Sequence, residues 1–165
     1  MKLKTLFYLF ILLALFALPT ISFAEVIELK IKGVGLESTL ETVKAKLGKP
    51  ISEKKSKADE NCFSNGEMIM ELKYSGLEIK LLGDKDAKNF KVKQMTLTSA
   101  KWKLENGITI GATDKQLTKK LGNPEYVFST PNQTYNYSHK GNQSGANFIF
   151  KNGKIFKIEW DEFLC

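Results

Sequence analysis

The chain has 165 residues, of which 42% are hydrophobic and 26% charged, and this composition excludes a disordered chain, a collagen and a long coiled coil. The formal net charge is +7, and every one of the 25 basic residues is a lysine. Arginine is the preferred reader of phosphate and guanine, so its absence argues against a nucleic-acid surface. One histidine and two cysteines leave little material for a metal site or a nucleophilic triad.

Residues 1–24 have the three parts of a secretory signal peptide. Two lysines precede an apolar run over residues 6–18, and the small residues Ser22 and Ala24 form a cleavage site. The run is too short to span a bilayer as a stable helix. The alternative is an uncleaved N-terminal anchor. We therefore expect a mature chain of residues 25–165 that is periplasmic or secreted.

The two cysteines, Cys62 and Cys165, predict one disulfide, because an exported chain meets an oxidising compartment. Two free thiols or a bond between chains are the alternatives. The sequence has no C-x-x-C motif, which argues against a redox role. Cys62 lies in the polar stretch 54–66, which has no apolar periodicity. A bond to Cys165 would order this stretch and the C-terminal tail.

Residues 32–50 and 106–124 align without a gap, 74 positions apart, with six of nineteen residues identical. Each segment has a threonine suited to an N-cap, two apolar residues four positions apart, a glycine suited to a helix C-terminus and a proline that forbids continuation. Each therefore predicts a helix of two to three turns. The residues are Thr39, Val43, Leu47, Gly48 and Pro50 in the first segment and Thr113, Leu117, Leu121, Gly122 and Pro124 in the second.

After each predicted helix, apolar and polar residues alternate at the period of a β-strand. The alternation includes residues 68–74, 77–81 and 90–99 in the first half, and Tyr135, Tyr137, Phe148, Phe150 and the run 156–160 in the second. These patterns predict an α+β fold of tandem helix-plus-antiparallel-sheet repeats, with the helices packed on one face of the sheet. The repeats would cover residues 25–103 and 104–165, with their sheets either separate or continuous.

The repeated motif resembles that of the superfamily of β-lactamase inhibitory proteins and SmpA/OmlA (BamE) outer-membrane-assembly lipoproteins. The first segment departs from it at Glu37, where the pattern has glycine. The resemblance implies the same tandem fold, and proteins that bind other proteins, often with the open sheet face, and are not enzymes. The lipid-anchoring cysteine of the lipoproteins is missing here. The motif is carried best by Gly107, Ile108, Gly111, Thr113, Leu117, Leu121, Gly122, Pro124, Phe148, Phe150, Gly153 and Ile155.

The alternation also predicts which polar side chains the sheet turns away from the helices. We interpret this face as a docking surface for a protein, and an ordinary solvated face is the alternative. Its mixed charges favour specificity over raw affinity, and we expect the large aromatic residues, the usual hot spots, to lie on the core side. The predicted protein-binding residues are Glu71, Lys73, Lys80, Thr96, Asn136, Lys157 and Glu159.

These observations predict an exported, non-catalytic protein-binding module, such as an inhibitor of an envelope enzyme or an envelope-assembly accessory protein. Its partner would be a protein in the cell envelope or outside the cell, and the chain would be a monomer with no catalytic site, cofactor, metal, nucleic acid or membrane span. The alternative is a binder of a small ligand or cell-wall fragment in a cleft between the repeats. An enzyme is a third hypothesis, which hydrolytic activity dependent on Asp161 or His139 would support.

Overall fold

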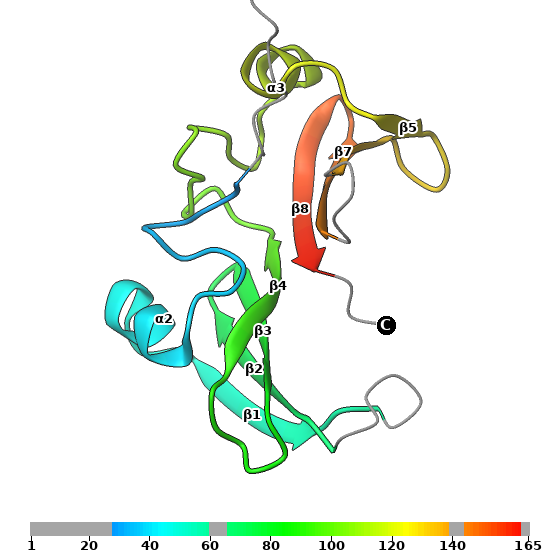
Figure 1. Cartoon of the computed structure of the whole chain (residues 1–165). Coiled ribbons are helices and arrows are strands. Elements are labelled where there is room, and N and C mark those ends of the chain that lie inside the picture. Colours follow the sequence, from blue (N-terminus) through cyan, green and yellow to red (C-terminus); the bar gives the residue numbers. More distant parts are fainter. Residues whose placement is uncertain (1–27, 60–65, 139–143, 163–165) are drawn as a thin grey trace, which may run out of the picture.

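The computed structural model describes residues 28–59, 66–138 and 144–162 (Figure 1). The predicted signal peptide, Cys62, Cys165 and His139 lie outside these residues, so the predictions that concern them stay predictions. Within the described part of the chain, no helix is long and apolar enough to cross a membrane.

The described residues form one eight-stranded antiparallel sheet with the strand order β1-β2-β3-β4-β8-β7-β6-β5. Strands β1 to β4 pair in chain order, and so do β5 to β8. The two groups meet where β4 pairs with β8. The strands are β1 (Ser52–Lys57), β2 (Met68–Tyr74), β3 (Leu77–Gly83), β4 (Lys91–Leu97), β5 (Tyr126–Phe128), β6 (Thr134–Ser138), β7 (Ser144–Lys151) and β8 (Lys154–Glu162).

This sheet shows that the predicted α+β fold of tandem helix-plus-antiparallel-sheet repeats is wrong. Residues 94–97 of β4 pair with residues 158–161 of β8, so all eight strands belong to a single sheet. The two helices, at residues 40–47 and 114–121, have only eight residues each, so the described part of the chain is mostly sheet. The last strand of each group would otherwise leave a row of N–H and C=O groups unpaired, and pairing the two strands satisfies both rows.

The two predicted helices and their caps are confirmed. Helix α2 (Leu40–Leu47) begins after Thr39, whose hydroxyl accepts a hydrogen bond from the N–H of Thr42 at 3.2 Å. Helix α3 (Asp114–Leu121) begins after Thr113, and there the side chain of Gln116 completes a capping box. The C-caps are Gly48 and Gly122, with φ values of 82° and 78° that favour glycine.

One face of the sheet, which we call the inner face, packs against both helices and forms the core. Figure 1 shows α2 beside the β1–β4 half and α3 beside the β5–β8 half. The helices contribute the fully buried side chains Val43 and Leu117 to this core. Because strand residues alternate between faces, the core contains every second residue of the central strands. These include Leu72, Ile79, Leu81, Met95, Leu97, Phe148, Ile158 and Trp160.

A buried tyrosine ties each helix end to the sheet. The hydroxyl of Tyr74 on β2 donates to the carbonyl of Gly48 at 3.1 Å, and that of Tyr137 on β6 donates to the carbonyl of Gly122 at 3.0 Å. These bonds satisfy carbonyl groups at helix ends, which lack partners within the helix. Burial raises the pKa of Tyr137 to about 12, so the phenol keeps its proton for this bond even in alkaline solution.

A β-bulge in β4 directs Lys93 away from the regular ladder. Lys80 pairs with Gln94 and Leu81 with Val92, so Lys93 is the extra residue of the bulge. Its ammonium group donates to the carboxylate of Glu37 and, at 2.5 Å, to that of Glu162 at the end of β8. Lys93 therefore links the loop before α2 to both strands at the junction of the sheet.

Candidate functional site

The second face of the sheet, which we call the outer face, carries all seven residues that the sequence predicted as a binding surface. The strand register aligns Lys73, Glu78, Thr96, Glu159, Asn147, Asn136 and Tyr126 in one row that crosses seven strands. The neighbouring pair of Glu71 and Lys80 lies on the same face, and so does Lys157 opposite Ile149. The helices pack on the inner face. The prediction that these side chains share a face is therefore confirmed, whereas their role in binding stays a prediction.

Two ion pairs and one side-chain hydrogen bond link neighbouring residues of the outer face. Lys73 lies 3.5 Å from Glu78, and Lys157 lies 2.9 Å from Glu159. The amide of Asn136 donates to the side-chain oxygen of Asn147 at 2.8 Å. Exposed ion pairs of this kind contribute little to stability, so these groups are available to orient a partner.

An acidic pair lies where the two groups of strands meet. Asp161 follows Glu159 by two residues on β8, so both carboxylates are on the outer face. Burial raises the pKa of Asp161, and the charge of Glu159 raises it further. A cationic group of a partner placed here would relieve this repulsion.

Two exposed aromatic residues complete the outer face at its β5 end. Tyr126 pairs with Asn136 and Phe128 with Thr134, so both rings lie on the outer side of the sheet. They are 55% and 52% exposed, and their centroids are 6.4 Å apart. The expectation that the large aromatics lie on the core side is therefore wrong for this pair. Among the described residues β5 is an edge strand, and both helices pack on the opposite face of the sheet.

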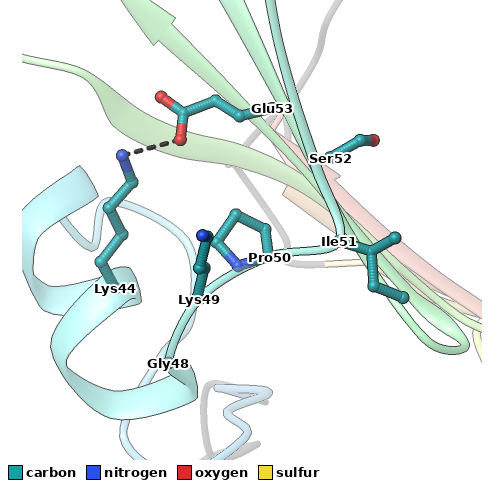
Figure 2. A pocket seen from close by; sticks show the side chains of 7 residues that line it. All are labelled: Lys44, Gly48, Lys49, Pro50, Ile51, Ser52 and Glu53. Carbon is teal, nitrogen blue, oxygen red and sulfur yellow. Dashed lines mark ion pairs between the residues drawn. The ribbon is translucent and has the colours of Figure 1, made fainter.

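A surface pocket of about 490 Å³ lies between the end of α2 and the start of β1 (Figure 2). Lys44 and Glu53 form an ion pair across it at 2.8 Å, and Ile51 at its rim is 75% exposed. All its lining residues come from the first half of the chain, so it is not the predicted cleft between the halves. The lining residues are Lys44, Gly48, Lys49, Pro50, Ile51, Ser52 and Glu53.

The structure offers no obvious metal ligands in the part that it describes. No group of three or more His, Cys, Asp or Glu side chains comes together among residues 28–59, 66–138 and 144–162.

Comparisons with known proteins do not place the chain in a family. No family model and no curated protein matches it. A DUF4309 family protein (YjgB) from Bacillus subtilis matches in structure with 13% identity and a TM-score of 0.42, over 80% of this chain and 84% of that one. An extracellular protein containing a SCP domain from Bacillus anthracis matches with 11% identity and a TM-score of 0.49, over 77% of this chain but only 44% of that one. At these TM-scores neither match carries an argument, and the resemblance to the β-lactamase inhibitory proteins stays a prediction.

Proposed function

We propose that the chain is an exported, non-catalytic module that binds a protein partner through the outer face of its sheet. The observation that carries the proposal is the outer face itself, where a row of polar and charged side chains ends at the exposed pair Tyr126 and Phe128. The signal peptide predicted in residues 1–24 supports a partner in the cell envelope or outside the cell.

The two parts of this surface suit different tasks in recognition. Exposed aromatic residues bury large areas with little loss of side-chain entropy, and tyrosine in particular is enriched at binding hot spots. The charges of Lys73, Glu78 and Glu159 in this row would set the orientation of the partner and reject surfaces of the wrong charge pattern. A partner that matches both parts would carry an apolar segment beside a charged, hydrogen-bonding surface.

Affinity capture with a matched pair of variants tests this function. Tagged protein produced from the full chain is incubated with envelope and secreted fractions of its source cells, and bound proteins are titrated for saturation. We expect a saturable protein partner that is lost with Glu159→Lys, because this change reverses the charge at the middle of the row. The control is Lys119→Glu, which reverses an exposed charge on α3, away from the sheet. Absence of a saturable partner, or equal capture by both variants, contradicts the proposal.

A further inference from the structure

Among the described residues, β5 combines exposed apolar side chains with a position at the edge of the sheet. Its three residues, Tyr126, Val127 and Phe128, are each more than half exposed. As the last strand in the sheet, β5 pairs with β6 on one side only. Alternate residues of a strand direct their N–H and C=O groups toward opposite edges of the strand. The edge of β5 that faces away from β6 therefore has backbone groups that could pair with another strand.

The opposite edge of the sheet is protected by charged residues, whereas β5 is protected only by its short length of three residues. β1 is fully exposed along its length, and its sequence SEKKSK places Lys54, Lys55 and Lys57 beside Glu53. Charged side chains, lysine above all, are the usual means by which edge strands avoid pairing with other chains. In a chain with 25 lysines, by contrast, residues 123–138 around β5 contain none. The three residues of β5 therefore lack the charges that oppose pairing with another strand.

We propose that this partner is β5 of a second copy, paired antiparallel about a two-fold axis at Val127. The strand is self-complementary because an aromatic residue lies on each side of a β-branched one. The axis would place Tyr126 opposite Phe128 of the partner subunit, and Phe128 opposite Tyr126 of the partner subunit. Four rings would then form one cluster on the outer face, with the two Val127 side chains in contact on the inner side.

The charges next to β5 permit this arrangement. Glu125 is the only charged residue between positions 123 and 138, and its carboxylate accepts a hydrogen bond from the hydroxyl of Ser138 on the neighbouring strand. In the proposed register Glu125 lies opposite Ser129 of the partner subunit, so no like charges face each other. The eight-stranded sheet would continue into the second copy through pairing of the two β5 strands, just as the pairing of β4 with β8 joins the two groups of strands within one chain.

The short length of β5 sets the strength of this dimer. The three strand residues from each copy, two of them aromatic, would bury less surface area than a standard interface of about 1,600 Å². We therefore expect a weak dimer, with a dissociation constant of about 100 µM. The proposal departs from the monomer expected from the sequence. It shares Tyr126 and Phe128 with the proposed binding surface, but it needs no other protein and can fail separately.

Sedimentation equilibrium of protein produced from the full chain tests the dimer. Between about 5 µM and about 1 mM we expect the mean mass to rise from that of a monomer toward that of a dimer. Val127→Lys should raise the dissociation constant at least tenfold, because two ammonium groups would meet at the two-fold axis. Val127 is 54% exposed, so the fold tolerates the change. The control Ile51→Lys alters the most exposed large apolar residue among those that the structure describes. This residue lies near the other edge, and the change should leave the mass curve unchanged.

Hydrogen exchange locates the contact. Amides of β5 should exchange more slowly as the concentration rises, whereas those of β1 should not change. The association should also persist with a reductant, which excludes a disulfide between chains. A monomer at all concentrations overturns the proposal. Association also overturns it if Val127→Lys leaves the dimer intact, if the reductant abolishes the dimer, or if the exchange of the β5 amides does not change. If Val127→Lys fails to fold, Phe128→Ser takes its place, with the same loss of dimer expected.

Discussion

Glu37 and Gly111, 74 positions apart in the two similar segments, have the same left-handed backbone conformation, with φ values of 64° and 91°. The N–H of Glu37 donates to the carbonyl of Val92, and that of Gly111 donates to the carbonyl of Ile155, both at 2.8 Å. Glycine adopts this conformation without strain, and glutamate does not. At position 37 the ion pairs with Lys91 and Lys93 offset part of this strain.

Gly111→Ala should lower the free energy of unfolding by about 1–2 kcal/mol, the cost of a left-handed conformation for a residue with a Cβ. No atom lies within 4 Å of the position of that Cβ, so the cost comes from the backbone alone. Gly145→Ala is the control, because Gly145 does not have a positive φ and its nearest neighbours are 3.8 Å away. Urea denaturation measures both. Equal stability of the two variants would show that the strain argument is wrong.

Glu37→Gln should remove a pH-dependent part of the stability. Burial raises the pKa of the Glu37 carboxyl, but the hydrogen bonds from Lys93 and Lys91 outweigh this effect and lower the pKa to about 2. The folded pKa thus lies below the unfolded value of 4.5, so the stabilisation is present above about pH 5 and is lost as the pH falls toward about 2.

The stability difference between wild type and Glu37→Gln should therefore be largest above about pH 5 and shrink toward about pH 2. Because the side chain is 47% exposed, we expect less than about 1 kcal/mol, with a further decrease at high salt. Unfolding curves at several pH values measure it. A difference that is constant across this range would mean that the carboxylate of Glu37 is not stabilised in the folded state.

Trp160→Ala should cost about 3–5 kcal/mol, the usual loss when a buried tryptophan is truncated. Trp160 on β8 is 2% exposed and lies opposite the fully buried Met95 on β4, where the two groups of strands meet. Phe156→Ala on the same strand is the control. Phe156 is 36% exposed, so its loss should cost less than about 2 kcal/mol. Similar costs for the two variants would show that the β4–β8 junction is not part of the shared core.

The disulfide between Cys62 and Cys165, which lie outside the described residues, stays a prediction. Mass analysis without reductant should show one bridge within the chain and no free thiol. Cys62→Ser should lower the thermal stability, because a bond that closes a loop of about 100 residues contributes up to about 4.7 kcal/mol. It should not prevent folding, because the core that the helices form with the sheet remains. Two thiols that alkylate freely in protein from its native compartment, or a variant as stable as the wild type, would exclude the bond.

Local chemistry explains which elements could be predicted. The helices were predictable because Thr39, Gly48 and their counterparts Thr113 and Gly122 mark the ends within a few residues. The outer face was predictable because strand residues alternate with period two. β1 was not predicted, since SEKKSK has no apolar residue and is a strand only through its pairing with β2.

Long-range pairing explains what the sequence could not show. No local pattern encodes the contact between β4 and β8, which joins residues more than sixty positions apart and makes one sheet of two groups of strands. The aromatic pair Tyr126 and Phe128 alternates as core residues do, but the register places it on the outer face of an edge strand, where neither described helix covers it. The fold class and the apolar end of the binding surface therefore depended on the topology.

The central claim, that the outer face binds a protein, is tested most directly by the affinity of the captured partner for two variants. Thr96→Arg places a long side chain at the middle of the outer face, opposite Glu78 and Glu159. Ala45→Arg adds the same side chain to an exposed position on α2. In a binding titration we expect Thr96→Arg to weaken the complex at least tenfold, which is about 1.4 kcal/mol, and Ala45→Arg to leave it unchanged. An unchanged affinity of Thr96→Arg would contradict the claim.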